Sequence, residues 1–419
     1  MRPKELVPLN PSDSPLSEVS VKILLADKLH PHSVQALQAI SGVEVLNQPS
    51  LGPDDLPQAI AGVEILIVRS TKVNAATIAA ADRLGLIIRA GSGYNTIDVE
   101  GASAKGVYVA NCPGKNSTAV AELAVGLMLA LDRNLADNVI DLRNGKWNKG
   151  KYGKAQGFKG RTVGLVGLGA IGQETAERLR PFGVKLLAWS RSLTQQRAEA
   201  HGLEYVPNLI ELAGRCDVIS LHLALSADTR GLIGKDFFAA MQKDAFLINT
   251  CRAEVVDQKA LLEAMQTKNI RMGTDVFEGE PSGKDGEFAS EISQHANCYG
   301  THHIGASTDQ AELDTGLEAA RIVQAFVSGQ PIPNCVNLRK PPSSASAITV
   351  RHQDRVGVLA GVFGVLKENG VNVQEMENLV FSGAKAASAR ILVEDLVSPQ
   401  VVAALEKCDG VLHVGATSL

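Results

Sequence analysis

The stretch that decides the fold runs from Val163 to Gly183 and reads VGLVGLGAIGQETAERLRPFG. Its first residues are apolar and predict a buried strand of a parallel sheet. Three glycines follow in the spacing G-x-G-x-x-G, at Gly167, Gly169 and Gly172, and a helical apolar pattern comes after them. The first glycine of such a motif permits a tight turn, the second lets the backbone approach a pyrophosphate, and the third lets the helix lie close on the sheet. The order of strand, glycine motif and helix therefore predicts a dinucleotide-binding site.

The end of the next strand bears on which dinucleotide is bound. The helix begins at Ala170 and Ile171 and presents free backbone N–H groups to an anion. The second strand, Val184 to Trp189, ends where a carboxylate usually binds the ribose hydroxyls of NAD. Ser190 and Arg191 stand there instead, and hydroxyl and guanidinium groups accept a 2′-phosphate. The sequence therefore favours NADP, while the alternative that Arg191 is an ordinary solvated turn residue leaves NAD open.

Length, charge and cysteine content narrow the class of protein. At 419 residues the chain is too long for one ordinary core and predicts two or three domains. With 41 basic and 45 acidic residues the net charge is −4, and no basic run indicates a nucleic-acid partner. The 6 cysteines lie far apart without a CxxC pair, which predicts reduced thiols and no metal site. No apolar run reaches membrane-spanning length and no signal peptide is recognisable, so we expect a soluble cytoplasmic protein without a membrane partner.

The first part of the chain predicts a second parallel sheet. Residues 1–20 carry four prolines and are expected to be a flexible tail, whereas residues 21–115 alternate short apolar strands with helical stretches. Two of these strands end in polar or glycine-rich turns, and such sheets bind ligands beyond the carboxyl ends of their strands. The turns and the crossing after them contain the candidate substrate-binding residues Arg69, Ser70, Lys72, Ser92, Gly93 and Asn116.

A long apolar pattern from Thr118 to Asn144 predicts one continuous helix. The basic, glycine-rich stretch KWNKGKYGKAQGFKG, residues 146–160, then predicts a solvated loop. Lys149, Lys151 and Lys154 in this loop are an alternative source of anion contacts.

Polar residues gather again at strand ends after the glycine motif. Thr250 and Arg252 follow the apolar run AFLIN, and an arginine directly after a buried strand is rarely only a surface residue. Asp275 lies in the strand RMGTDVF and is followed by Glu280, and His303 lies in THHIGAST. The alternatives are that Glu280 is a solvated charge and that His303 belongs to the core.

The composition changes near the C-terminus. Residues 339–346 are rich in proline and serine and predict a linker. Residues 347–419 follow the order strand, helix, strand, strand, helix, strand, which predicts a ferredoxin-like βαββαβ domain.

Five separated motifs give the chain a resemblance to the D-2-hydroxyacid dehydrogenase family. In chain order they are RAGSGYNTIDV, NCPGKNSTAVAEL, GLVGLGAIG, INTCRAEVVD with DVFEGEP, and HHIGAST. The resemblance implies an α/β fold with two Rossmann-like, doubly wound parallel-sheet domains and a C-terminal ACT regulatory domain. It also implies that the dinucleotide-binding domain, residues 116–304, is inserted into a discontinuous substrate-binding domain made of residues 21–115 and 305–338.

The resemblance assigns roles to individual residues. It implies that Arg252, Glu280 and His303 are catalytic and that Asp275 lies beside the nicotinamide. In that arrangement the imidazole exchanges the proton of the substrate hydroxyl, the glutamate fixes its tautomer, and the arginine holds the substrate carboxylate with a bidentate fork. Arg69 and Lys72 are the implied contacts of a substrate phosphate.

The implied activity is the oxidation of 3-phosphoglycerate to 3-phosphohydroxypyruvate, the first committed step of serine biosynthesis. Two alternatives stay open: a glyoxylate or hydroxypyruvate reductase, which shares every catalytic motif, and a non-catalytic dinucleotide-sensing interaction protein. The implied assembly is a homodimer built on the helix from 118 to 144, or a homotetramer joined through the ACT domain.

The ACT domain implies an amino-acid effector. Its candidate contacts are His352, Asp354 and Asn372. Asp354 stands where the family usually has an asparagine that holds serine, and its charge repels an effector carboxylate. The sequence therefore leaves open whether serine inhibits the enzyme.

Overall fold

The computed structural model of the protein describes residues 20–281, 286–339 and 345–418. It divides into two compact units, one ending at Asn337 and one beginning at Leu338. Most of the expected N-terminal tail, residues 1–19, and of the expected linker, residues 340–344, lies outside the described residues. Within the described ranges, no helix combines the length and the apolar character needed to cross a bilayer.

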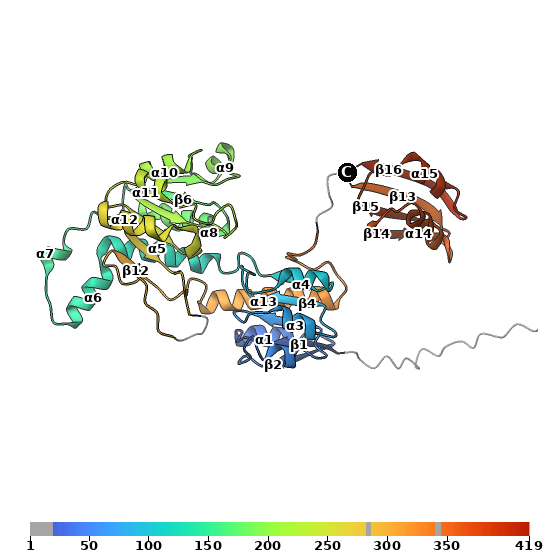
Figure 1. Ribbon diagram of the computed structural model, residues 1–419, viewed down its shortest axis with the longest axis horizontal. Helices are drawn as coiled ribbons and strands as arrows, with labels where there is room; N and C mark the ends of the chain where they lie inside the picture. The colour runs from blue at the N-terminus through green and yellow to red at the C-terminus, as the bar shows by residue number, and fades with distance from the viewer. Residues whose placement is uncertain (1–19, 282–285, 340–344, 419) are drawn as a thin grey trace, which may run out of the picture. The chain divides into compact units, whose positions relative to one another are not determined.

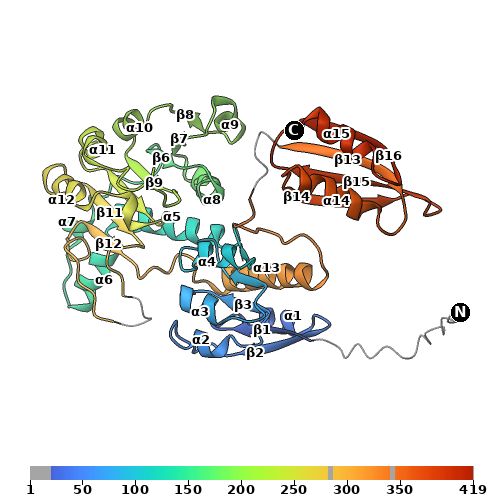
Figure 2. The same cartoon turned by 45° about the vertical axis from the view of Figure 1, so that its right-hand side comes forward.

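The first unit contains a five-stranded parallel sheet in the order β2-β1-β3-β4-β5. Its strands are β1 (Val21–Leu25), β2 (Val43–Asn47), β3 (Ile65–Val68), β4 (Leu86–Arg89) and β5 (Tyr108–Asn111). The helices between them are α1 (Pro31–Gln38), α2 (Leu56–Ala59), α3 (Ala75–Ala80) and α4 (Val99–Ala104). Helix α13 (Asp309–Val327) returns from much later in the chain and packs against α1, as Figures 1 and 2 show. Ile322 and Val323 of α13 are fully buried in one core with strands β1, β3 and β4.

The same unit contains a second, seven-stranded parallel sheet in the order β12-β11-β10-β9-β6-β7-β8. Its strands are β6 (Thr162–Val166), β7 (Lys185–Trp189), β8 (Glu204–Tyr205), β9 (Val218–Leu221), β10 (Phe246–Asn249), β11 (Arg271–Thr274) and β12 (Cys298–Gly300). Its helices are α8 (Ala170–Leu179), α9 (Gln195–Ala200), α10 (Leu209–Arg215), α11 (Lys235–Ala240) and α12 (Gln258–Thr267), with short 3-10 turns at Arg180–Phe182 and Ala253–Val255. The strand order reverses between β6 and β9, which is where a doubly wound sheet opens a ligand crevice.

The two parallel sheets confirm the predicted Rossmann-like fold class. The first sheet and α13 lie within residues 21–115 and 305–338, and the second sheet lies within residues 116–304. This placement is consistent with the predicted insertion of the dinucleotide-binding domain into the substrate-binding domain. The exact domain boundaries stay a prediction.

The prediction of one helix from 118 to 144 was wrong. The structure has α5 (Ser117–Arg133) and α6 (Leu135–Arg143), separated by Asn134, whose φ of 50° is left-handed and ends the first helix. Helix α5 packs against α8 and against strands β10 and β11 and buries one of its faces there, whereas no residue of α6 is buried. A further short helix, α7 (Lys149–Tyr152), lies within the stretch expected to be loop. Figure 1 shows α6 and α7 as an arm at the outer side of this part of the molecule.

The second unit is a four-stranded antiparallel sheet with two helices. Its elements are β13 (Ser346–Gln353), α14 (Val358–Glu368), β14 (Val373–Val380), β15 (Ala386–Val393), α15 (Pro399–Glu406) and β16 (Val411–Ser418). The strand order β14-β15-β13-β16 and the antiparallel pairing confirm the predicted ferredoxin-like domain. Its core is closed by apolar side chains of both helices and the two central strands, including Ile348, Ile391, Leu366 and Leu405.

Candidate active site

The glycine turn after β6 has the geometry that a pyrophosphate requires. Gly167 has a φ of +100°, and a Cβ there would lie 2.3 Å from the carbonyl oxygen of His222. A Cβ on Gly172 would lie 2.2 Å from the carbonyl oxygen of Gly167, so only glycine lets α8 start this close to the strand. A Cβ on Gly169 would meet nothing within 4 Å, and no side chain caps the helix that begins at Ala170. The backbone N–H groups here are therefore open to an anion.

The opposite end of the predicted dinucleotide site contains a contact that the sequence did not indicate. Arg191, directly after β7, forms an ion pair with Asp228 in the loop after β9, with 2.6 Å between Nη1 and Oδ2. Both side chains are largely exposed, at 79% and 73%. Asp228 is thus a carboxylate beside the guanidinium that was expected to receive a 2′-phosphate. Arg191 is therefore paired with a carboxylate and is not a free cation.

His303 and Glu280 form a hydrogen-bonded pair, with 2.7 Å between His303 Nδ1 and Glu280 Oε2. The other oxygen of Glu280 accepts a hydrogen bond from the backbone N–H of Phe277 at 2.7 Å. The hydrogen bond to Glu280 raises the pKa of His303 above its ordinary value, against the opposing effect of burial. Burial by itself raises the pKa of Glu280, but the hydrogen bonds from His303 and Phe277 outweigh it, so this pKa is lowered. Because an ionised carboxylate only accepts, Nδ1 carries the proton and Nε2 is left for a substrate.

Arg252 lies directly against the glycine-rich turn after β4. Its Nη1 donates a hydrogen bond to the carbonyl oxygen of Cys251 at 2.6 Å. A Cβ on Gly93 would lie 2.7 Å from Nη2 of Arg252, so the absence of a side chain at Gly93 allows this approach. The structure therefore brings together two predicted site residues that are far apart in the sequence.

Asp275 is buried and organises the turn that carries His303. Its Oδ1 accepts hydrogen bonds from Thr301 Oγ1 at 2.6 Å and from the backbone N–H of Ile304 at 2.8 Å. Its Oδ2 accepts from the backbone N–H of Gly305, also at 2.8 Å. His303 has a φ of 53°, an uncommon conformation for a residue with a side chain, which this network holds in place. The sequence predicted Asp275 at the nicotinamide, and in the structure both of its oxygens bind the His303 turn.

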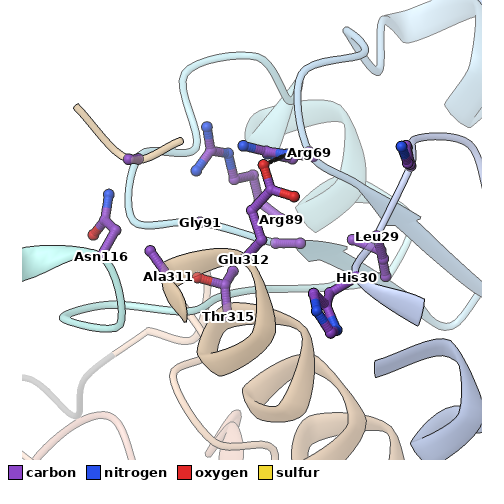
Figure 3. Close-up of a pocket in the computed structure, with 12 residues that line it drawn as sticks. Leu29, His30, Arg69, Arg89, Gly91, Asn116, Ala311, Glu312 and Thr315 are labelled. Carbon is purple, nitrogen blue, oxygen red and sulfur yellow. Dashed lines mark hydrogen bonds and ion pairs between the residues drawn. The ribbon is translucent and has the colours of Figure 1, made fainter. Parts of the chain in front are cut away.

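A cavity rich in cationic side chains opens beyond the carboxyl ends of β3 and β4 (Figure 3). Among its lining residues are Lys28, His30, Arg69, Arg89, Gly91, Asn116, Glu312 and Thr315. Arg69 donates a hydrogen bond from Nη1 to Glu312 Oε1 of α13 at 2.7 Å. Of the predicted substrate-binding residues, the cavity therefore includes Arg69 and Asn116.

The remaining predicted substrate-binding residues lie around this cavity or outside it. Ser92 donates a hydrogen bond to Asn116 Oδ1 at 2.7 Å and so holds that amide. Ser70 and Lys72 are exposed and do not line the cavity. The backbone N–H groups of Arg69 and Ser70 are bound by Asp27 Oδ2, at 2.7 and 2.9 Å. This turn therefore contributes the side chain of Arg69, and its backbone donors are already used.

Sequence reasoning missed Arg89, the last residue of β4. Its Nε is buried and has no hydrogen-bond partner among the described residues. Burial, with the nearby charges of Arg252 and Arg69, lowers the pKa of Arg89 to about 10. The signal that identified Arg252, an arginine at the end of a buried strand, applies equally to Arg89 and was sufficient to find it. A desolvated guanidinium with an unused donor is suited to bind an anion.

Thr250 was predicted to contact the cofactor, and its hydroxyl has no hydrogen-bond partner among the described residues. Thr250 follows β10 and is buried, so this unpaired Oγ1 is available to a cofactor.

In the second unit, the predicted effector contacts Asp354 and Asn372 are exposed, but His352 is buried. The ring nitrogens of His352 are engaged by the carbonyl oxygen of Gln353 at 2.8 Å and by Asn378 Oδ1 at 3.1 Å. Neither nitrogen of His352 is left for an effector. Across the described ranges, no three His, Cys, Asp or Glu side chains gather as metal ligands do.

Comparisons with known proteins agree with this geometry. A family model described as D-isomer specific 2-hydroxyacid dehydrogenase, NAD binding domain, matches residues 125–305. The chain is 34% identical over 392 residues to D-3-phosphoglycerate dehydrogenase of Methanocaldococcus jannaschii, covering 92% of this chain and 73% of that one. A 3-phosphoglycerate dehydrogenase structure from Entamoeba histolytica with bound NAD⁺ is similar with a TM-score of 0.63 and 26% identity, covering 77% of this chain and 100% of that one. An acyclic imino acid reductase in complex with NADPH and D-Arg is similar with a TM-score of 0.65 and 25% identity, covering 75% of this chain and 100% of that one.

Proposed function

Because the chain belongs to the D-isomer specific 2-hydroxyacid dehydrogenase family, we propose that it oxidises 3-phosphoglycerate to 3-phosphohydroxypyruvate in serine biosynthesis. The observation that carries the proposal is the hydrogen-bonded acid–base pair of His303 and Glu280, together with a cavity lined by Lys28, Arg69 and Arg89. Arg252, which lies against Gly93, connects the two regions, because its charge acts on both His303 and Arg89. A substrate with a 2-hydroxy acid at one end and a phosphate at the other matches this arrangement.

The roles of the residues follow from their chemistry. Nε2 of His303 accepts the proton of the C2 hydroxyl during oxidation, and Glu280 stabilises the imidazolium that results. Arg252 binds the substrate carboxylate with its guanidinium fork and so orients C2. The chemistry that an oxidised nicotinamide would supply when bound is an acceptor for the hydride of C2. Arg69 and Arg89 bind the phosphate at the other end of the substrate.

The cofactor is a nicotinamide dinucleotide. The open backbone at Gly169, the uncapped start of α8 and the unused hydroxyl of Thr250 fit this group. We propose NADP as the favoured form, because Ser190 and Arg191 replace the expected carboxylate. The ion pair of Arg191 with Asp228 weakens this preference, since the 2′-phosphate must compete with a carboxylate.

A comparison of substrates tests the proposed activity against its alternatives. We expect kcat/KM for 3-phosphohydroxypyruvate to exceed the values for glyoxylate and hydroxypyruvate by at least tenfold, about 1.4 kcal/mol of transition-state binding. A preference for glyoxylate or hydroxypyruvate would identify a reductase of that kind. Binding of a dinucleotide without turnover of any 2-hydroxy acid or 2-keto acid would instead support the non-catalytic sensing protein.

The proposal includes a homodimer formed through α6. Four apolar side chains of this helix are exposed by 44–55%, which is unusual for a surface that only water covers. These are Leu135, Val139, Ile140 and Leu142. A second copy of the chain is the proposed occupant of this surface, and pairing of the ferredoxin-like domains extends the dimer to a tetramer. We also propose that an amino-acid effector binds the ferredoxin-like domain without a contact from His352.

The proposed location of the protein is the cytoplasm, where its 6 cysteines, all free thiols, stay reduced.

A further inference from the structure

We propose that Glu312 is a specificity-determining residue of the cationic cavity, where its carboxylate competes with the substrate's phosphate for Arg69. The inference rests on the proposed function and concerns how strongly this enzyme binds the phosphorylated end of its substrate.

The geometry places Glu312 where the phosphate has to bind. Its Oε1 lies 2.7 Å from Nη1 of Arg69, and the two side chains are 31% and 28% exposed. Figure 3 shows Arg69 and Arg89 reaching the cavity from the ends of β3 and β4, with Glu312 opposite them on α13. Arg69 Nη2 has a weaker contact, 3.5 Å, with Ser307 Oγ. The principal partner of Arg69 is therefore the carboxylate of Glu312, which is negatively charged like the phosphate of the substrate.

The two arginines of the cavity, Arg69 and Arg89, differ in whether the guanidinium already has a negatively charged partner. Arg89 has a buried Nε without a partner among the described residues, whereas the charge of Arg69 is already offset. A phosphate that enters the cavity meets the cations of Lys28, Arg69 and Arg89 together with one negative charge. Like charges at short distance in a partly desolvated site repel each other appreciably. Glu312 therefore lowers the affinity for phosphate below the value that the arginines alone would produce.

A positioning role for Glu312 predicts the opposite effect on the KM. A carboxylate can hold an arginine in the orientation that its ligand needs, and its removal would then weaken binding. The two effects change the KM in opposite directions, so a single substitution separates them.

Glu312→Gln tests the proposal because glutamine retains the size and hydrogen-bonding capacity of the side chain and removes its charge. We expect KM for 3-phosphohydroxypyruvate to fall about three- to tenfold, with kcat changed less than about twofold and KM for hydroxypyruvate unchanged. Asp314→Asn is the matched control, because it removes one charge from an exposed position of the same helix. In an Arg69→Ala background we expect the part of the effect that comes from competition for Arg69 to disappear, while the direct repulsion between the Glu312 carboxylate and the phosphate remains. An unchanged or raised KM, or equal shifts for the two substrates, would overturn the proposal.

A binding measurement separates this inference from the proposed function. Calorimetric titration of the full chain with inorganic phosphate requires no turnover, and we expect Glu312→Gln to bind phosphate about three- to tenfold more tightly than the unsubstituted protein. If neither keto acid is reduced but phosphate binding tightens, the proposed function fails and the role of Glu312 stands. If phosphate binds equally well to both proteins, or to neither, the role assigned to Glu312 is wrong.

Discussion

Glu280 controls the pH at which His303 loses its proton, because its hydrogen bond raises the pKa of the imidazole. In the proposed mechanism oxidation requires neutral His303, so we expect kcat/KM for oxidation to fall as the pH drops through this raised pKa. Glu280→Gln removes the charge that raises the pKa, and we expect the acid limb of the profile to move to lower pH. In the reduction direction, where His303 must be protonated, we expect the basic limb of the kcat/KM profile to move to lower pH as well.

The pH profile of kcat/KM at saturating cofactor measures this shift. His303→Ala serves as the control: it should lower kcat by roughly 100- to 10,000-fold and remove the acid limb. An acid limb that stays in place in Glu280→Gln would show that another group titrates there.

We propose that Arg89 contributes to phosphate binding separately from Arg69. We expect Arg89→Gln to raise KM for 3-phosphohydroxypyruvate at least tenfold, because a desolvated charge-assisted hydrogen bond contributes about 1.5 to 3 kcal/mol. KM for hydroxypyruvate should change much less. Arg69→Ala is the comparison variant, and its smaller expected effect follows from the competing Glu312 carboxylate. Equal losses with both substrates would remove Arg89 from the phosphate site.

At the scale of elements, we propose that the turns after β7 and β9 together determine the choice between NAD and NADP. We expect Asp228→Asn to lower the Kd for NADPH about twofold to fivefold, because an exposed ion pair contributes at most about 1 kcal/mol, and to leave the Kd for NADH nearly unchanged. Ser190→Asp combined with Arg191→Ala should move the preference toward NADH. Fluorescence titration with both reduced cofactors measures these constants. Tighter binding of NADH than of NADPH by the unsubstituted protein would contradict the role of Arg191.

Helix α5 is attached to β6 by a buried ion pair, with 2.7 Å between Arg161 Nη2 and Asp132 Oδ1. The side chains are only 10% and 2% exposed, and the guanidinium also lies 4.8 Å from the ring centroid of Phe246. Asp132→Ala leaves this cation buried without its partner, so we expect the free energy of unfolding to fall by about 3 kcal/mol.

Urea unfolding followed by far-UV circular dichroism measures this loss of stability. Glu177→Ala, which breaks an exposed pair with Arg180, is the matched control and should change the stability by less than about 1 kcal/mol. A similar small change for Asp132→Ala would mean that the buried pair contributes little to holding α5.

At the scale of the whole molecule, we propose that the exposed apolar face of α6 is the surface through which two copies of the chain associate. We expect the protein to be a dimer or tetramer at micromolar concentration, and the double variant Ile140→Glu with Leu142→Glu to be a monomer, because a charge on this face disfavours its burial. Light scattering after size-exclusion chromatography measures the mass. The double variant Lys146→Glu with Lys149→Glu, on exposed positions just beyond α6, controls for the change in charge. A monomeric unsubstituted protein would contradict the interface.

The sequence by itself determined the features that depend on local pattern. The strand and helix periods predicted all three sheets, and the spacing of Gly167, Gly169 and Gly172 predicted a turn whose atoms leave no room for side chains at the first and third positions. The resemblance then indicated Glu280 and His303, which the structure places in hydrogen-bond contact. Local pattern suffices for such features because backbone geometry and alternation of apolar residues are properties of neighbouring residues.

Only the tertiary structure decided which charges are free and which are already paired. Arg69 and Glu312 are 243 residues apart in the chain and Arg191 and Asp228 are 37 apart, so no local pattern shows that each pair is in contact. The burial of Arg89 and of His352 likewise depends on elements packed around them from other parts of the chain. The physical reason is that ion pairing and desolvation act through space, over a few ångströms, and folding alone determines which residues come that close.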